Sequence, residues 1–436
     1  MSEEYDAIII GAGVIGAAIA YELARRGRRT MAVDRLPAPG YGSTSNSCAI
    51  VRASYSTWDG VAMAYEGFSY WHDWKDYLGA DDESELARYV ACGTVQLKNR
   101  RDGHWRKVLP HYESVGVRYE EWDLDTLRHR LPLFSTGSFH PPRRPDDPRF
   151  WDDPREELLG AIHTPESGYV TDPQLATRNL ATAAERHGAV FRYGEEVTAV
   201  HRDGGRVEGV GLASGDTLRA PIVVNAAGPH SFVVNRMAGV EDDMAITTRA
   251  LRHEVHHVPA PEGFDFEGDG MHVSDADVGI YFRPESGNHI LVGSEDPECD
   301  PRVWVDDPDA FDRRVTRDAW DAQVLRLARR IPGLGIPDRP KGVVDLYDVS
   351  DDWIPIYDRS SLDGFYMAVG TSGNQFKNAG VVGHCMAELI GAVEAGADHD
   401  EDPVVVRTRY RGLDLDMGFY SRTREVNTDS SFSVNG

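Results

Sequence analysis

The sequence predicts an α/β (α+β) protein of two domains that begins with a Rossmann-like unit. Three observations support this fold class. The chain has 436 residues, more than the roughly 250–300 at which a single hydrophobic core stops growing. Its first segments alternate as strand, helix and strand. A glycine-rich turn joins the first strand to the helix.

The opening unit is predicted from its hydrophobic periodicity. Residues 5–11 form a short apolar run typical of a buried strand, and residues 14–26 place apolar side chains along one face of a helix. A second strand over residues 30–33 ends at Asp34. Together these segments form a complete β-α-β unit.

Further elements follow along the chain. Asp172 is the expected N-cap of a second helix, Pro173 occupies its first position, and Gly188 ends it. A hairpin-like pair of strands precedes the apolar run that ends near residue 228. Near the C-terminus, residues 365–370 predict a strand and residues 381–393 a helix, with a glycine-rich loop between them.

The glycine-rich turn has the spacing of a dinucleotide-binding motif. Gly11 allows the tight turn, Gly13 allows a pyrophosphate to approach the backbone, and Gly16 allows the helix to pack on the strand. The helix N-terminus then presents free N–H groups to the phosphates. Asp34, at the end of the second strand, is suited to a ribose hydroxyl.

The segment HEVHH, residues 253–257, matches the H-E-x-x-H pattern of zinc proteases. Two such histidines share a metal only on a helix, where they lie one turn apart. Residues 250–259 alternate as a strand, which would separate the two histidines by ~13 Å. We therefore interpret them as strand histidines and predict no metal site.

Composition excludes several classes of protein. The formal net charge of −25 argues against a nucleic-acid partner, because such a partner requires a basic patch. No apolar run reaches the ~18 residues of a membrane helix, and the nucleotide motif begins too early for a signal peptide. The four cysteines are widely spaced and are interpreted as free thiols. We expect a cytoplasmic protein with no membrane partner.

Two segments show no regular pattern. Residues 138–154 are rich in proline and predict a loop over or beside the substrate entrance, with Phe150 or Trp151 as an apolar wall. The residues after Gly418 are polar and predict an extended tail.

Several motifs together resemble a known family. The chain is similar to the D-amino-acid-oxidase-like (DAO) FAD oxidoreductases, in particular to the branch that contains sarcosine oxidase and N-methyl amino acid oxidase. The order and spacing of the motifs carry this resemblance over nearly the whole chain. They are GAGVIG (11–16), GSTSNSCAIVRASY (42–55), SGYVTDPQLA (167–176), VVNAAGPHS (223–231) and GTSGNQFKNAG (370–380).

The resemblance implies a Rossmann-like FAD-binding domain with an inserted substrate domain that contains a mixed β-sheet. The FAD domain would comprise residues 1–88, 160–235 and 342–436. The substrate domain would comprise residues 89–159 and 236–341. The flavin ring would then lie at the boundary between the domains.

The resemblance also assigns a cofactor site. Small residues in the 370–380 loop allow close backbone approach to the flavin, and the helix that follows would face the edge of the ring where reduced flavin accumulates negative charge. The expected FAD-binding residues are Gly11, Gly13, Val14, Ile15, Gly16, Asp34, Arg35, Ser43, Thr44, Val197, Ala227, Gly228, Gly370, Gly373, Asn374, Gln375, Phe376 and Lys377.

Four residues are expected at the substrate. Arg52 and Lys377 match the two cations that this branch uses to hold a substrate carboxylate, and paired cations would place the α-carbon under flavin N5. Tyr281 and Tyr347 match active-site tyrosines. The alternatives are an arginine that contacts the flavin or the surface, a solvated lysine, and core tyrosines.

The chain departs from the family pattern at three places. Asp345 occupies the position of the cysteine that bonds the flavin in sarcosine oxidase, and residues 42–55 contain no histidine for the other known attachment. We therefore expect non-covalent FAD. The family's oxygen-activating lysine aligns with Leu291, which leaves either O₂ or another molecule as electron acceptor.

These observations predict FAD-dependent oxidation of a small amine, such as an amino acid or N-methyl amino acid. Hydride would pass to flavin N5 and the imine would hydrolyse. A 2-hydroxy-acid dehydrogenase is the first alternative, although it would need a histidine base, and no histidine lies in a matching motif. A flavoprotein subunit of an electron-transfer complex is the second.

Overall fold

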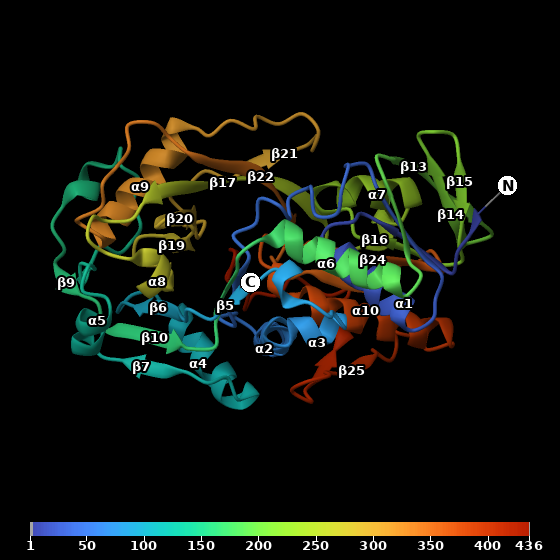
Figure 1. The fold of residues 1–436 in the computed structure, drawn as a ribbon, viewed down its shortest axis with the longest axis horizontal. Coiled ribbons are helices and arrows are strands. Elements are labelled where there is room, and N and C mark those ends of the chain that lie inside the picture. Colours follow the sequence, from blue (N-terminus) through green and yellow to red (C-terminus); the bar gives the residue numbers. More distant parts are fainter. Residues whose placement is uncertain (1–2, 436) are drawn as a thin grey trace.

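The computed structural model describes residues 3–435. Two groups of elements lie side by side (Figure 1). One contains α1 (Val14–Arg25), α6 (Pro173–Arg186) and α10 (Ala379–Glu394). The other is built on a large sheet, whose long strands β17 (Thr248–Pro259) and β22 (Gly342–Ser350) extend toward the first group.

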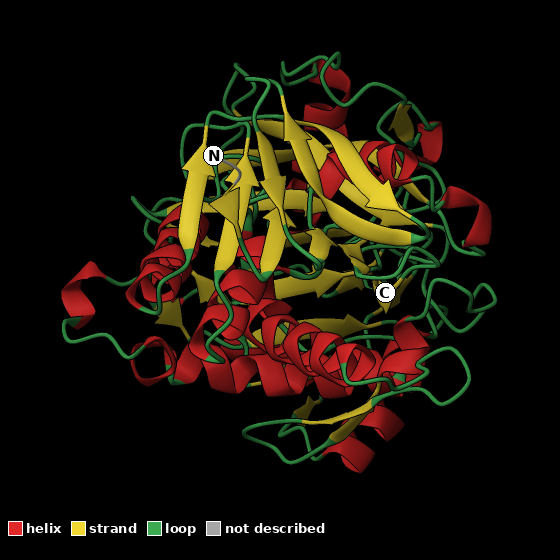
Figure 2. Cartoon of the chain, turned by 90° about the vertical axis from the view of Figure 1, so that its right-hand side faces the viewer, coloured by secondary structure: helices red, strands yellow, loops and turns green. Residues whose placement is uncertain are grey.

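A six-stranded sheet forms the centre of the first group. Its neighbouring strands pair in parallel, except that β23 is antiparallel to β24. Helices α1, α6 and α10 pack together in a layer against the strands (Figure 2). The strand order is β12 (Val190–Tyr193), β3 (Thr30–Asp34), β2 (Ala7–Ile10), β16 (Val223–Asn225), β24 (Phe365–Val369) and β23 (Ile356–Arg359).

The predicted opening unit is confirmed, since β2, α1 and β3 follow one another as expected. The first strand begins at Ala7 rather than residue 5, because Glu3–Glu4 (β1) pairs with a different sheet. The cap of α6 is also as predicted: the Asp172 carboxylate accepts a hydrogen bond from the N–H of Leu175 at 2.8 Å.

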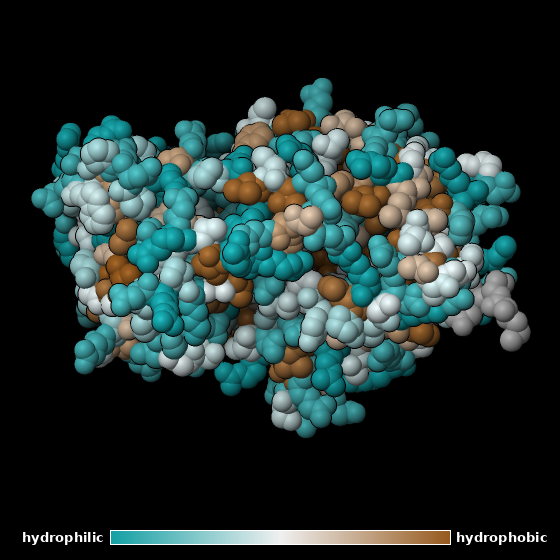
Figure 3. All heavy atoms as spheres, turned by 90° about the horizontal axis from the view of Figure 1, so that it is seen from above, coloured by the Kyte–Doolittle hydropathy of each residue, from teal (hydrophilic) through white to brown (hydrophobic). Residues whose placement is uncertain are grey.

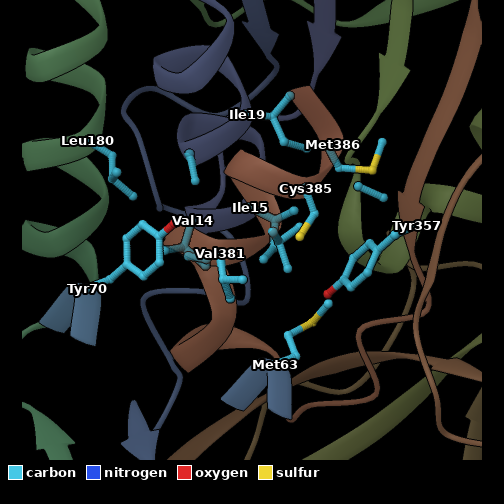
Figure 4. Packing of buried hydrophobic residues seen from close by; sticks show 14 of the residues in the cluster. Val14, Ile15, Ile19, Met63, Tyr70, Leu180, Tyr357, Val381, Cys385 and Met386 are labelled. Carbon is cyan, nitrogen blue, oxygen red and sulfur yellow. The ribbon is translucent and has the colours of Figure 1, made fainter. Parts of the chain in front are cut away.

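The helices share one apolar core. Val14 and Ile15 from α1 lie near Val381 and Cys385 from α10, with Tyr70 from α2 (Trp58–His72) close by (Figure 4). This burial holds the N-terminus of α1 in place above the sheet. On the opposite face lie α7 (Ser231–Ala238) and a small sheet of β1 (Glu3–Glu4), β15 (Thr217–Arg219), β14 (Arg206–Leu212) and β13 (Val197–Asp203).

The second group is built on a nine-stranded mixed sheet, which agrees with the predicted fold class. Neighbouring strands are antiparallel except for the parallel pair β18 and β6. The order is β21 (Val303–Val305), β17, β20 (His289–Ser294), β19 (Ile280–Glu285), β18 (His272–Asp275), β6 (Thr94–Lys98), β10 (Gly160–Thr164) and β7 (Glu120–Trp122), with β22 paired to β17.

The remaining elements connect or cover these sheets. Helices α4 (His104–Val115), α5 (Leu124–Arg130), α8 (Phe266–Asp269) and α9 (Arg317–Arg330) accompany the large sheet. The others are α3 (Trp74–Leu78), the sheet of β4 (Ile50–Val51), β11 (Gly168–Val170) and β5 (Tyr89–Val90), and the pairs β8 (Gly137–Ser138) with β9 (Glu156–Glu157) and β25 (Val405–Arg407) with β26 (Asp414–Asp416).

Strand pairing differs from the expected domain borders at two places. Residues 160–164 and 342–350 were expected in the cofactor domain, but β10 pairs with β6 and β7, and β22 pairs with β17. Their backbone hydrogen bonds therefore belong to the large sheet. We propose that the cofactor segments begin after these two strands, while the three-segment organisation stays as predicted.

The sequence 253–257 lies within β17, so the rejection of a zinc motif is supported. No cluster of three potential metal-binding side chains occurs within residues 3–435.

The prediction for residues 138–154 is wrong in one respect. None of these residues lines the main cavity. Ser138 Oγ and the N–H of Phe139 bond to the Asp277 carboxylate, and Phe139 packs against the core on the far face of the large sheet. Phe150 is buried there, and Trp151 is 61% exposed. The segment lies on the face of the large sheet against which its phenylalanines pack. That face is turned away from the cavity.

Candidate functional site

One cavity of about 490 Å³ extends from the first β-α turn to the face of the large sheet. Its walls come from both groups of elements, so the site exists only where they meet. The face seen from above is largely hydrophilic, with apolar residues scattered among the polar ones (Figure 3). The interior cavity is the principal candidate site, because ligand sites are concave and combine apolar walls with a few polar groups.

The turn before α1 requires glycine for steric reasons. Gly11 has a φ of 106°, and a Cβ there would lie 2.4 Å from the carbonyl oxygen of Ala226. A Cβ at Gly16 would lie 2.0 Å from the carbonyl oxygen of Gly11. The N-cap Gly13 has no side chain to cap α1, and the N–H of Val14 donates to the Thr44 hydroxyl at 3.3 Å. The next N–H groups of this helix end are suited to an anion.

Asp34 supports this turn directly. One carboxylate oxygen accepts the N–H of Ala12 at 2.7 Å and the other accepts the N–H of Leu36 at 2.8 Å. The carboxylate is thus held at the end of β3, facing the cavity that Gly13 also lines.

Most predicted cofactor residues line this cavity, but two do not. Gly16 is occupied by helix–strand packing, as its predicted role requires. Gly370 lies behind the wall, where its N–H bonds to the Asp348 carboxylate at 2.6 Å. The predicted residues that line the cavity are Gly11, Gly13, Val14, Ile15, Asp34, Arg35, Ser43, Thr44, Val197, Ala227, Gly228, Gly373, Asn374, Gln375, Phe376 and Lys377.

The two predicted cations line the same cavity. Arg52 is 6% exposed and Lys377 is 3% exposed. Arg52 donates to the carbonyl oxygens of Ser54 and Val434. Lys377 donates to the Tyr55 hydroxyl at 2.8 Å and to the carbonyl oxygen of Asn374 at 2.6 Å.

Neither cation has a carboxylate within 4.0 Å among residues 3–435. Burial and the nearby Arg52 hold the pKa of Lys377 well below its usual value. An anion bound here would stabilise both charges, because it would replace hydration that the buried site does not supply.

Both predicted tyrosines also line the cavity. The Tyr281 hydroxyl lies 3.6 Å from Cys48 Sγ, and a Cβ on Gly293 would lie 2.4 Å from that hydroxyl. Tyr347 stacks on His253 with ring centroids 4.3 Å apart. Burial raises the pKa of both tyrosines, so their hydroxyls remain hydrogen-bond donors at neutral pH.

The structure adds residues that the motifs did not indicate. His272 and Glu295 line the cavity from the large sheet, and Val434 lines it from the C-terminal tail. His272 and Tyr281 come from strands whose alternation places them on one face. That alternation was visible in the sequence, but the direction of the face was not.

Comparison with known proteins identifies the family to which a chain with this cavity belongs. Residues 6–389 match the family described as FAD dependent oxidoreductase, DAO. The chain belongs to the DAO family. A glycine turn, an open helix end and an acid after the second strand are consistent with the FAD on which this family depends.

Relatives of this DAO-family chain include several enzymes. D-amino acid dehydrogenase of Xanthobacter autotrophicus is 29% identical over 51% of this chain and 61% of the relative. The match thus spans less than two thirds of that protein. Glycine oxidase of Geobacillus kaustophilus is 24% identical over 91% of this chain and 96% of the relative. The structure of L-proline dehydrogenase from P. horikoshii shares the fold, with a TM-score of 0.77 and 20% identity over 98% of this chain and 100% of that chain.

The positions that depart from the family pattern also have defined surroundings. Asp345 lines the cavity and accepts a hydrogen bond from the Asn46 amide at 2.6 Å. Leu291 packs with the apolar cluster around Tyr281. Among the described residues, Lys377 is the one lysine on the cavity wall. None of the helices described has both the length and the apolar character to cross a bilayer. The cytoplasmic location stays a prediction.

Proposed function

We propose that this chain catalyses FAD-dependent oxidation of a small amine that carries a carboxylate, such as an amino acid or N-methyl amino acid. The observation that carries the proposal is the pair Arg52 and Lys377. Both are buried, both line the cavity, and neither has a described carboxylate as partner. Relatives that act on D-amino acids, glycine and L-proline support the same substrate class.

The chain's own residues would bind and orient the substrate. Arg52 and Lys377 hold the carboxylate, which fixes the position of the neighbouring carbon. Tyr281 and Tyr347 close the apolar side and donate hydrogen bonds. FAD, when bound, supplies the hydride acceptor. The turn at 11–16, Asp34 and the 373–377 loop would hold it.

We also propose that the FAD is bound without a covalent bond. Asp345 stands where a cysteine would attach the ring, and residues 42–55 contain no histidine. After acid precipitation, the yellow colour should remain in the supernatant. A yellow pellet would contradict this.

The decisive test is anaerobic bleaching of the flavin. Purified holoprotein is mixed without oxygen with glycine, sarcosine, L-proline and D-alanine, and separately with lactate and glycolate. Bleaching by at least one amine and by neither hydroxy acid is the expected result. No bleaching by any compound would favour an electron-transfer subunit.

One observation favours the hydroxy-acid alternative. His272 lines the cavity and its Nε2 atom has no hydrogen-bond partner, so a histidine is available at the site, although burial and Arg52 hold its pKa well below the usual value. Bleaching by lactate or glycolate alone would assign that reaction, and His272→Asn should then abolish it.

A further inference from the structure

We propose that Glu295 is the catalytic base that takes the proton from the substrate's ammonium group. This rests on the proposed amine oxidation and assigns it a step that neither the motifs nor the relatives indicate. The removal matters because only the neutral amine, with its free electron pair, can release hydride from the neighbouring carbon.

The position of Glu295 supports this role. It follows β20 directly, is 7% exposed, and lines the cavity. One carboxylate oxygen, Oε1, accepts a hydrogen bond from Ser274 Oγ at 2.5 Å. The other, Oε2, is buried and has no hydrogen-bond partner. Ser274 therefore fixes the side chain while Oε2 stays free for a ligand.

Three other carboxylates of the cavity wall already have partners. Asp34 accepts two backbone N–H groups at the cofactor turn. Asp309 pairs with Arg35, and Asp345 bonds to Asn46. Among the described residues that line the cavity, Glu295 is the one acid with a buried oxygen that lacks a partner.

Glu295 and Arg52 line the same cavity. The positive charge of Arg52 opposes the rise in the Glu295 pKa. They are not in contact, because no ion pair within 4.0 Å joins them. In an α-amino acid the ammonium is bonded to the carbon that carries the carboxylate. A carboxylate bound to Arg52 would therefore hold the ammonium inside the cavity that Glu295 also lines.

Several charged groups surround Glu295. Arg52 approaches from the segment after β4, Asp275 from β18, and Asp102 from the turn before α4. His272, also on β18, is buried and lines the same part of the wall. Burial is the main cause that raises the pKa of Glu295 to about 8, with Asp275 and Asp102 adding to it and Ser274 and Arg52 opposing it.

The step balances as a simple proton transfer. One N–H bond of the ammonium breaks, an O–H bond to Glu295 Oε2 forms, and no electrons are exchanged. A base whose pKa lies near 8 is well matched, since it is strong enough to accept the proton and is partly ionised at neutral pH.

The experiment compares Glu295→Gln with the wild type. Anaerobic flavin reduction by sarcosine, glycine, L-proline and D-alanine is followed by stopped flow between pH 6 and 10. Because Glu295 must be ionised to accept a proton, wild-type reduction should rise with pH through about 8. Glu295→Gln should lose about a hundredfold at pH 7. It should recover toward the wild-type rate at high pH, where the free substrate amine is already neutral. Glu295→Asp, which keeps a carboxylate, should retain part of the rise in reduction rate near pH 8.

Glu298→Gln is the matched control. Glu298 makes the same Glu-to-Gln change possible three residues away, is exposed and does not line the cavity. This variant should keep the wild-type pH profile. As a readout without substrate, an infrared band of a protonated carboxyl that titrates near pH 8 should be present in the wild type and missing in Glu295→Gln, while the band of buried Asp348, with a pKa of about 7, should remain in both.

The outcomes separate the two proposals. If no amine bleaches the wild type, the proposed function fails and the inference fails with it. If an amine bleaches the wild type and Glu295→Gln with the same pH profile, amine oxidation stands and Glu295 is not the base. A uniform loss at all pH values, without recovery, would also overturn the inference.

Discussion

Lys377 shows how one buried side chain is tuned by its surroundings. Its ammonium is 3% exposed, and its partners are the Tyr55 hydroxyl and the Asn374 carbonyl oxygen. Burial and Arg52 lower its pKa. A substrate carboxylate would reverse part of this shift, because a nearby negative charge favours the charged amine. Substrate binding should therefore raise the pKa of Lys377.

We predict that Lys377→Met weakens substrate binding and leaves FAD in place. A hydrogen bond to a charged group contributes about 1.5–3 kcal/mol, so binding should fall roughly ten- to a hundredfold. Spectral titration of the oxidised flavin with the bleaching amine measures the effect. Lys341→Met, at an exposed position, is the control. Loss of FAD with normal substrate binding would place Lys377 in the cofactor site instead.

At the scale of elements, a loop after β21 reaches across to the cofactor end. Asp309 accepts a hydrogen bond from Arg35 at 3.0 Å and contacts His230 at 3.2 Å. Asp309 and Phe311 both line the cavity. Arg35 directly follows Asp34, so this loop closes the cleft beside the predicted ribose site.

We predict that Asp309→Asn loosens FAD. Exposed ion pairs contribute up to about 1 kcal/mol, so the FAD dissociation constant should rise up to about fivefold. The difference between variant and wild type should shrink at high salt. Flavin fluorescence on dilution measures it. Asp321→Asn, which breaks an exposed pair with Arg317 on α9, should have no effect. Equal FAD affinity in both variants would show that the contact between Asp309 and Arg35 does not help to hold FAD.

The C-terminal tail is the second element that completes the site. Residues 421–435 form no helix or strand, as expected, but they do not extend freely into solvent. Ser430 donates to the carbonyl oxygen of Asp352 at 2.6 Å, and Arg302 donates to that of Phe432 at 2.6 Å. Val434 then packs against Tyr281 and its carbonyl oxygen accepts from Arg52.

We predict that truncation after Ser431 broadens substrate choice. Removing Val434 opens the cavity wall and releases one Arg52 N–H group. Glycine and sarcosine should bind more weakly, while larger amino acids such as D-phenylalanine should gain relative to them. Anaerobic reduction rates across this series measure the change. Val426→Ala, at an exposed tail position, is the control. An unchanged order of substrates would show that the tail is structural only.

At the scale of the whole molecule, the cavity lies between two sheets, and one lysine of the described residues, Lys377, lines its wall. Reaction of reduced flavin with oxygen begins by forming superoxide, which a fixed positive charge stabilises. Leu291 stands where the family's oxygen-activating lysine aligns, within an apolar cluster. Among the described residues, Arg52 and Lys377 are the buried arginine and lysine of the cavity wall, and a bound product carboxylate would partly neutralise them.

We therefore predict slow reoxidation by oxygen, so that another acceptor takes the electrons. Photoreduced protein is mixed with air-saturated buffer, with and without an artificial acceptor such as a quinone. Faster reoxidation by the quinone is the expected result. Leu291→Lys should increase the oxygen rate if the missing charge is the cause. Rapid reoxidation with stoichiometric hydrogen peroxide would show that this lysine is dispensable here.

Local sequence patterns were sufficient to predict the elements around the cofactor site. Only glycine fits at positions 11 and 16, because a Cβ there would collide with a backbone carbonyl oxygen. The helix cap at Asp172 was predicted from the residues next to it. The alternation of apolar and polar residues similarly predicted strand β17 and argued against a zinc-binding helix at residues 253–257. Local pattern did not indicate that residues 160–164 and 342–350 pair with strands of the large sheet, because strand pairing is a long-range contact.

The sequence by itself determined the Rossmann-like start and the family, and it indicated Arg52 and Lys377 as candidates for binding the substrate carboxylate. Each of these depends on motifs whose residues are neighbours along the chain. Only the tertiary structure decided that Glu295, His272 and Val434 meet at one cavity, and that residues 138–154 face away from it. Alternation along a strand divides its side chains between two faces. Which face meets the cofactor domain depends on how two separate sheets pack, and that is a property of the folded chain alone.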